Sequence, residues 1–482
     1  MSPLHFLILF LLLSLPITCF SESVSAEDAD IPKPIEKPDV MSSEYRAFWN
    51  DQIQSEIDAR IEKFRKADAT VVLTNVKPGS EVQIEQIGHE FLFGAHIFNF
   101  DQLGSDDLNA KYKELYGTLF NSATIAFYWK TFEPEPGKTR FQGAYEDSAE
   151  FWNQQSDPKS QPHWRRPATD PVVAFCESKG IQMNGHTIIW GNRKWQHPDW
   201  LPKDPDQIAE MEKLFEKRIK ELAEYYQGRL NRWDVVNESA TDYRLQKTGK
   251  LEQNDAFHQN SSYGLMPADY AFQAFQTAKA AFPETVQFNI NEYAVDDFYA
   301  DQVQNLIDRG CRIDLVGVQM HLFNPQETLD IAAGKNIQTP EIQKKRLSAA
   351  DQTGKPLHLS EITITAPNDN EKGRAIQAEV ARNLYRYWFS WPSMIGITWW
   401  NVVDDCGAPG EPSTSGLFTR QMEPKPSFFA LNQLINEEWK TRLSFQAESD
   451  SVEYRFRGFK GTYRIRWINR DGTEKSMEMI VH

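Results

Sequence analysis

Residues 233–238, Trp-Asp-Val-Val-Asn-Glu, join a short, largely apolar run to a polar end. The run Trp233–Val236 is too short for a typical helix and is characteristic of a strand buried on both faces of a parallel sheet. Asn237 and Glu238 follow at the position where this strand is predicted to end. Similar runs recur along the chain, and they decide the fold class.

Eight runs of this kind alternate with segments of helical periodicity such as Gln207–Tyr226 and Pro267–Ala281. In chain order they are Phe91–Ala95, Ala123–Phe127, Ile181–Ile188, Trp233–Val236, Val286–Ile290, Leu315–Gln319, Leu357–Ser360 and Ile395–Trp399. Periodicity alone also fits a doubly wound sheet. The count of eight, over a span of about 350 residues, favours an α/β fold of the (β/α)8 TIM barrel type.

Small β elements are predicted at both ends of this barrel. An amphipathic helix over 43–66 precedes a predicted hairpin of Ala69–Asn75 and Glu81–Ile87, with Pro78-Gly79 as the turn. Three alternating strands are predicted after residue 441. The expected organisation is a signal peptide (1–26), a Pro-rich linker (27–40), an N-terminal helix and hairpin (41–87), the barrel (88–440) and a C-terminal β element (441–482).

The N-terminus has the pattern of an export signal. The apolar run Phe6–Leu13 is shorter than the roughly 20 residues of a membrane-spanning helix, and Val24-Ser25-Ala26 supplies small residues before a cleavage site. We therefore expect a protein that is secreted, or periplasmic or at the cell surface, with no membrane segment after cleavage. We also expect a monomer. Three cysteines, Cys176, Cys311 and Cys406, would remain in the mature chain, so at least one cannot pair within it.

The charge balance limits the partners. Fifty-two Lys and Arg against 68 Asp and Glu give a net charge of −16. An acidic chain lacks the basic footprint of a duplex nucleic-acid binder, and it disfavours a strongly anionic polymer as substrate. A neutral polysaccharide remains compatible, although the charge also has a plain explanation in solubility.

Two glutamates follow predicted strands that lie across the barrel from each other. Glu238 follows strand four, and Glu361 follows His358-Leu359-Ser360 of strand seven. Because the catalytic groups of TIM barrels lie at the carboxyl ends of the strands, both carboxyls should face the same opening. A pair of carboxyls, one acid and one nucleophile, is what retaining glycoside hydrolysis requires.

Other predicted strand ends carry hydrogen-bonding and aromatic side chains suited to a sugar polymer. They include His186, Trp190, Asn291, Gln319, His321 and Trp400. His186 and His321 alone have no metal-ligand spacing, so we expect neither a metal nor another cofactor.

The chain resembles glycoside hydrolase family 10, the endo-β-1,4-xylanases, over roughly residues 88–438. The motifs are GHTIIW (185–190), WDVVNE (233–238), NINEY (289–293), GVQMH (317–321), SEI (360–362) and GITWW (396–400). The resemblance implies a retaining mechanism with Glu238 as acid/base and Glu361 as nucleophile. It also implies catalytic support from Asn237, Gln319 and His321, and substrate contacts from Lys130, His186, Trp190, Asn291 and Trp400.

The sequence departs from the family pattern where substrate is contacted. The family usually has Glu-Asn ahead of its lysine on strand two, whereas Ala126-Phe127 precede Tyr128-Trp129-Lys130 here. Thr363 stands where the family often has Asp, and the loop at 406–410 lacks the usual Trp. The catalytic machinery is thus retained while the sugar contacts have changed.

Three hypotheses follow. The first is a secreted retaining endo-β-1,4-xylanase acting on a neutral, plant-type polysaccharide. The second is the same chemistry, hydrolysis or transglycosylation, on another β-linked polysaccharide such as a glucan or a modified xylan. The third is a carbohydrate-binding protein without catalysis, which the presence of both glutamates disfavours.

Overall fold

The computed structural model describes residues 39–250 and 265–482. The expected signal peptide and all but the last two residues of the expected linker lie outside the described residues. Among the residues that are described, no helix is both long and apolar enough to cross a membrane.

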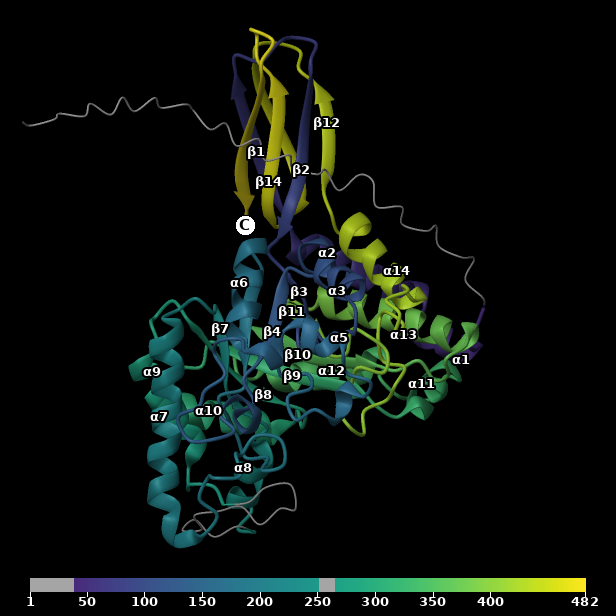
Figure 1. The fold of residues 1–482 in the computed structure, drawn as a ribbon. Coiled ribbons are helices and arrows are strands. Elements are labelled where there is room, and N and C mark those ends of the chain that lie inside the picture. Colours follow the sequence, from purple (N-terminus) through teal and green to yellow (C-terminus); the bar gives the residue numbers. More distant parts are fainter. Residues whose placement is uncertain (1–38, 251–264) are drawn as a thin grey trace, which may run out of the picture. The chain divides into compact units, whose positions relative to one another are not determined.

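A closed parallel barrel confirms the predicted fold class (Figure 1). Its strands are β3 (Leu92–His96), β4 (Ser122–Ala126), β5 (Gln182–His186) with β6 (Ile189–Trp190), β7 (Arg232–Asn237), β8 (Gln287–Glu292), β9 (Leu315–Leu322), β10 (Leu357–Ile364) and β11 (Met394–Trp399). Each strand is parallel to its neighbours, and β11 pairs back onto β3 to close the ring. All eight predicted runs fall on these strands, because a strand covered by helices outside and side chains inside is apolar throughout.

Helices follow the barrel strands along the chain (Figure 1). They are α3 (Asp106–Thr118), α4 (Trp129–Phe132), α5 (Ala149–Asn153), α6 (Thr169–Lys179), α7 (Ile208–Tyr226), α8 (Ala240–Lys247), α9 (Tyr270–Ala281), α10 (Asp297–Asp308), α11 (Pro325–Ala332), α12 (Pro340–Asp351), α13 (Glu371–Ser390) and α14 (Pro426–Asn432). Short turns η1 (Tyr145–Asp147), η2 (Pro158–Ser160) and η3 (Pro205–Gln207) and a π-helical turn η4 (Gln433–Glu438) complete them.

The predicted helix over 43–66 is two helices, α1 (Ser43–Phe48) and α2 (Asp51–Arg65). The break is at Asn50, whose extended backbone and side-chain oxygen, accepting from the Ile53 N–H at 3.1 Å, start α2 afresh.

The two terminal β elements form one module, and the predicted N-terminal hairpin is wrong. Strand β1 (Lys66–Thr74) pairs with β13 (Ser451–Phe459), while β2 (Glu81–His89) lies between β12 (Arg442–Gln446) and β14 (Gly461–Ile468), with β15 (Glu474–Val481) beyond. The backbone between β1 and β2 explains this, because it bonds to the C-terminal segment. The N–H of Lys77 donates to the Ile468 carbonyl, and that of Gly79 to the Ala447 carbonyl.

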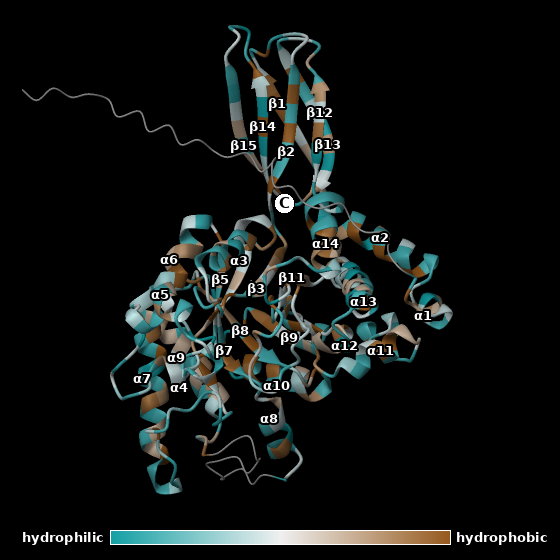
Figure 2. Cartoon of the chain, turned by 45° about the vertical axis from the view of Figure 1, so that its right-hand side comes forward, coloured by the Kyte–Doolittle hydropathy of each residue, from teal (hydrophilic) through white to brown (hydrophobic). Residues whose placement is uncertain are grey.

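This β module, β1, β2 and β12–β15, has its own hydrophobic core. Alternate residues of each strand point inward, and Figure 2 shows brown and teal alternating along β2 and β14. Its members that are at most 1% exposed are Val71, Val76, Val82, Ile84, Ala447, Tyr463 and Ile465. The module is therefore built jointly by both ends of the described chain.

The described cysteines Cys176, Cys311 and Cys406 are all free and buried. Burial raises the pKa of Cys176 to about 12 and that of Cys406 to about 11, so both are inert thiols at neutral pH.

Candidate active site

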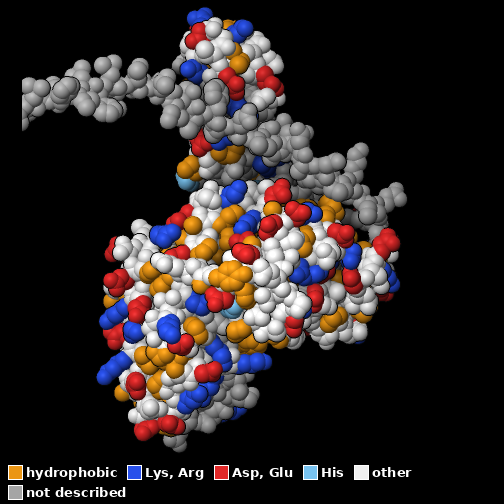
Figure 3. Space-filling model, in the orientation of Figure 1, with side chains coloured by type: hydrophobic (Ala, Val, Ile, Leu, Met, Phe, Trp, Pro, Cys, Tyr) orange, Lys and Arg blue, Asp and Glu red, His pale blue; other side chains and the backbone are white. Residues whose placement is uncertain are grey.

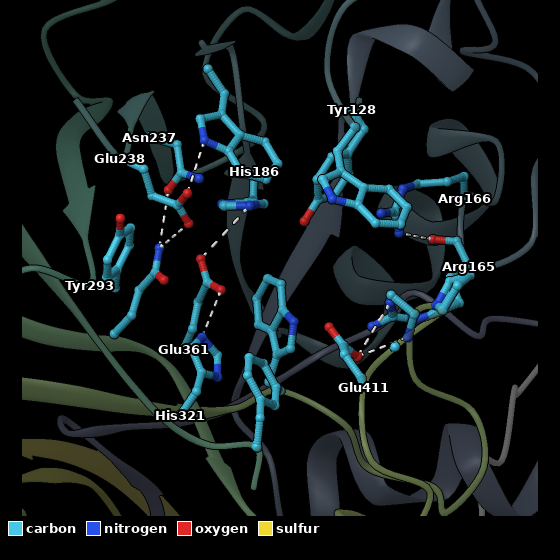
Figure 4. Close-up of a pocket in the computed structure, with 18 of the residues that line it drawn as sticks. Tyr128, Arg165, Arg166, His186, Asn237, Glu238, Tyr293, His321, Glu361 and Glu411 are labelled. Carbon is cyan, nitrogen blue, oxygen red and sulfur yellow. Dashed lines mark hydrogen bonds and ion pairs between the residues drawn. The ribbon is translucent and has the colours of Figure 1, made fainter. Parts of the chain in front are cut away.

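A pocket of about 560 Å³ opens at the carboxyl ends of the barrel strands (Figure 4). It is lined mostly by aromatic and polar side chains: Tyr128, Arg165, Arg166, His186, Trp190, Trp195, Asn237, Glu238, Tyr293, Gln319, His321, Phe323, Gln338, Arg346, Glu361, Trp400 and Glu411, together with Ala408-Pro409-Gly410. Both predicted glutamates are members, so the expected meeting of Glu238 and Glu361 at one opening is seen.

Irregular pairing positions both glutamates. His358 of β10 pairs with Gly317 of β9, and Glu361 pairs with Gln319. Two residues separate the first pair from the second on β10 but only one on β9, so β10 has one extra residue just before the glutamate. Strand β7 has a similar shift after Asp234, and Glu238 follows it with a positive φ of 53°. Bulges beside active sites re-aim a side chain, and here they direct two carboxyls into the pocket.

Glu238 is a partly buried acid whose carboxyl is fixed by hydrogen bonds. Burial, followed by the neighbouring carboxylates Glu361 and Glu292, raises the pKa of Glu238 to about 8. Gln319 Nε2 donates to one carboxyl oxygen at 3.1 Å and Trp190 Nε1 to the other at 3.0 Å. The group thus keeps its proton at neutral pH and is fixed in direction, as a general acid requires.

One amide donor and two imidazoles surround Glu361. Asn291 Nδ2 donates to its Oε1 at 2.7 Å, His186 Nε2 lies 3.8 Å from Oε1, and His321 Nε2 lies 3.4 Å from Oε2. His321 is itself held by Thr363 Oγ1, 2.9 Å from its Nδ1. These neighbours fix the direction of the Glu361 carboxyl, as a nucleophile requires.

Three amides connect the two glutamates. The Asn237 Oδ1 accepts from Asn291 Nδ2 at 2.9 Å and from Gln319 Nε2 at 3.3 Å. Since Asn291 also donates to Glu361 and Gln319 to Glu238, one chain of hydrogen bonds fixes both carboxyls relative to each other. This agrees with the supporting roles expected for Asn237 and Gln319.

Asp234 lies beneath the pocket and orients His186. Its carboxylate accepts from His186 Nδ1 at 2.6 Å, from Asn184 at 3.1 Å and from Asn289 at 2.6 Å. Burial would raise the pKa of Asp234, but these partners lower it overall. His186 is thereby held with its Nε2 toward the nucleophile.

Two expected substrate residues lie elsewhere. Asn291 has no exposed surface and lies behind Glu361, so it positions the nucleophile rather than touching sugar. Lys130, in the short helix α4, is not among the pocket-lining residues and pairs with Asp199 at 3.2 Å. Tyr128, two residues earlier, lines the pocket instead, with its ring centroid 5.3 Å from that of His186.

Trp190 and Trp400 line the pocket as expected. With Phe98, Ala126 and Tyr128 they form a small separate apolar cluster. Flat aromatic faces beside hydrogen-bonding groups are typical of sites for small polar ligands with apolar faces, such as sugars.

Sequence reasoning missed Arg165, Arg166 and Glu411, which line the end of the pocket away from Glu238 (Figure 4). Both arginines come from the long connection over 133–168 between α4 and α6, and Glu411 from the connection after β11. The one available signal was the length of the first connection, because long loops in compact domains are often functional.

The geometry suits cleavage of a glycosidic bond. Glu238, whose pKa is raised, and Glu361 share one pocket, each fixed by hydrogen bonds, with aromatic side chains around them. In a retaining glycosidase, the first gives its proton to the leaving oxygen while the second attacks the anomeric carbon.

Comparisons with known proteins agree with this chemistry. A model of glycosyl hydrolase family 10 matches residues 90–434. An endo-1,4-beta-xylanase B of Thermotoga neapolitana is 26% identical over 345 residues, which cover 69% of this chain and 85% of that protein. An endo-1,4-beta-xylanase C of Paenibacillus barcinonensis is 26% identical over 377 residues, 72% of this chain but 31% of that longer protein.

The solved structure of native xylanase 10B from Thermotoga maritima shares the fold, with a TM-score of 0.52 and 20% identity over 72% of this chain and 96% of that one. The family match covers most of the chain and includes both glutamates with their amide and histidine partners. This protein belongs to glycosyl hydrolase family 10.

Proposed function

We propose that this protein is a retaining endo-β-1,4-xylanase that cleaves internal bonds of a xylan-type polysaccharide. The observation that carries the proposal is the contrast between its two carboxyls. Burial and neighbouring negative charge raise the pKa of Glu238, while Glu361 accepts a hydrogen bond from Asn291 and lies beside the imidazoles of His186 and His321.

The reaction follows in two displacements. Glu361 Oε attacks the anomeric carbon as Glu238 gives its proton to the leaving glycosidic oxygen, so a glycosyl ester forms and the C–O bond breaks. Glu238, now a carboxylate, takes a proton from a water molecule, whose oxygen attacks the same carbon and releases Glu361. The hydrogen-bonded amides that connect Glu361 to Glu238 hold the two carboxyls in fixed relative positions through both steps.

The choice of xylan is supported by the family and by the two relatives described above, both of which are named endo-1,4-beta-xylanases. Six aromatic side chains line the pocket, and they suit the faces of neutral pyranose rings: Tyr128, Trp190, Trp195, Tyr293, Phe323 and Trp400.

A panel of polymers tests the proposal. The purified protein is incubated with β-1,4-linked xylan, glucan and mannan, and reducing ends are measured over time. We expect release from xylan, none with Glu361→Ala, and wild-type rates with Glu210→Ala, an exposed glutamate of α7. Release from glucan or mannan alone would overturn the substrate, and no release from any of them would overturn the activity.

We further propose that the protein is exported and acts as a monomer. The apolar run Phe6–Leu13 with small residues to Ala26 supports export. N-terminal sequencing and light scattering of the protein recovered outside the cytoplasm test both. A start at Met1 or a dimeric mass would contradict them.

A further inference from the structure

The end of the pocket away from Glu238 is positively charged. We call it the arginine end: Arg165 and Arg166, with Tyr128 and Glu411 beside them (Figure 4). It holds two guanidinium groups and one carboxylate. This contrasts with the chain as a whole, whose net charge is −16 and whose surface mixes acidic and basic side chains on the face shown in Figure 3.

Arg166 makes no close ion pair among the described residues, and Glu411 acts on it only at longer range. Its Nη1 donates to the Arg165 carbonyl at 2.8 Å, and its guanidinium lies over the Tyr128 ring, 3.7 Å from the centroid, and over Phe98 at 5.2 Å. Burial lowers the pKa of Arg166 to about 10, so the group is still charged at neutral pH. A stacked arginine presents the donor edge of its planar fork to whatever occupies the pocket.

Arg165 is only 2% exposed and is fixed by the opposite loop. Its Nη2 donates to Asn401 Oδ1 at 3.0 Å, and its Nη1 lies 3.8 Å from Glu411 Oε2. Its Nε is buried without a hydrogen-bond partner among the described residues. The head group of Arg165 is thus held at the pocket wall by Asn401 and Glu411.

Neighbouring contacts place the arginine end on the glycone side of the scissile bond. From Glu361 the chain of contacts runs to His186 at 3.8 Å, on to Tyr128 at 5.3 Å between ring centroids, and from there to Arg166. Glu238, which must lie toward the leaving group, is at the other side of the nucleophile (Figure 4). The arginines therefore face the sugar units that remain on the enzyme after the first displacement.

We propose that Arg165 and Arg166 bind the carboxylate of a uronic acid unit carried by the substrate on the glycone side of the cleaved bond. This rests on the proposed function, because it assigns a charged decoration to the same polysaccharide. A planar guanidinium matches a carboxylate with two parallel hydrogen bonds, which a neutral hydroxyl cannot accept. Two arginines against Glu411 leave one positive charge in excess at this end, and a single carboxylate on the substrate balances it. A strongly anionic polymer would instead be repelled by the acidic protein as a whole.

The experiment compares two forms of one substrate. The probes are a xylo-oligosaccharide with a single glucuronic acid branch, the methyl ester of the same branch, which has nearly the same shape without the charge, and the unbranched oligosaccharide. Values of kcat/KM are measured for wild type, Arg166→Gln and the control Lys138→Gln, an exposed cation of the same connection. Arg166 is chosen over Arg165, since Arg165 also ties two loops together.

We expect wild type and Lys138→Gln to prefer the acid over its methyl ester by about tenfold or more, the size of a charge-assisted hydrogen bond. Arg166→Gln should bring this ratio near one, and because acid and ester are compared within each variant, any change in rate common to both substrates cancels. Equal rates on acid and ester in the wild type, or an acid preference that survives Arg166→Gln, would overturn the proposal.

Calorimetry separates this inference from the proposed function. Dissociation constants are measured for xylose carrying a glucuronic acid branch and for the methyl ester of the same compound. These measurements need no turnover. If no xylan is cleaved, the proposed function fails, yet tighter binding of the acid, lost in Arg166→Gln, still supports the arginine site. Equal binding of acid and ester would overturn the site even if xylan is cleaved.

Discussion

Asn291 donates a hydrogen bond of 2.7 Å from Nδ2 to Glu361 Oε1 while remaining completely buried. The same nitrogen donates to Asn237 Oδ1, and Ser360 Oγ donates to Asn291 Oδ1. The nucleophile is therefore aimed from below by an amide that no substrate reaches, which separates the positioning of the carboxylate from the binding of sugar.

Asn291→Ala removes this support without touching the pocket wall. We expect kcat to fall about 10- to 100-fold, because the reacting carboxylate loses its fixed direction, with KM little changed. Steady-state kinetics on xylan, with the exposed Asn305→Ala of α10 as control, measure this. A raised KM at unchanged kcat would instead assign Asn291 to substrate binding.

The pH dependence of kcat/KM should report Glu238. Because its pKa is raised to about 8, the acid form persists through neutrality and activity should fall above pH 8. The hydrogen bond from Trp190 lowers this pKa, so Trp190→Phe should move the alkaline limb to higher pH. An alkaline limb near pH 5, the behaviour of an ordinary glutamate, would contradict the assignment of the acid.

The same pKa shift makes a prediction about stability. Unfolding returns Glu238 from a pKa of about 8 to about 4.5, so the unfolded chain loses this proton first as pH rises. The folded state is thus penalised increasingly between pH 4.5 and 8. Glu238→Gln cannot ionise, and its melting temperature should exceed that of wild type by a margin that grows across this window. A constant or shrinking margin would contradict the shift.

The β module should contribute stability rather than chemistry. Tyr463 is fully buried in its core and donates from its hydroxyl to the Phe459 carbonyl at 2.6 Å, while the pocket-lining residues all lie between Tyr128 and Glu411. Tyr463→Ala should cost about 3–5 kcal/mol of module stability, and Tyr463→Phe about 1 kcal/mol. Calorimetric unfolding and xylan kinetics check this. A large loss of kcat at a temperature where the protein is folded would point to a functional module.

The barrel could be predicted because its signal is local. Each strand, such as Trp233–Val236, is buried on both sides and is therefore apolar within a short window. The pairing of β1 with β13 could not be predicted in this way, since it joins the two ends of the described chain. The turn signal at Pro78-Gly79 is real, but its backbone bonds to residues near the C-terminus instead of closing a hairpin.

The residues of the active site also differ in whether the sequence could locate them. Glu238 and Glu361 could be located because strand ends of a barrel converge. Arg165 and Arg166 could not, because they lie in the irregular stretch between η2 and α6, and their place opposite Glu411 depends on how two loops fold. The resemblance to the family's strand-two lysine predicts that Lys130 lies in the site. In the structure it lies on the short helix α4 and pairs with Asp199.

The most direct test of this account follows the anomeric form of the first product. Xylan oligosaccharide is mixed with the enzyme, and NMR spectra are taken before mutarotation equilibrates the new reducing ends. Glu238 as acid and Glu361 as nucleophile predict β-anomer first, because two inversions restore the configuration. If the α-anomer appears first, cleavage proceeds by a single displacement, and Glu361 is not the nucleophile.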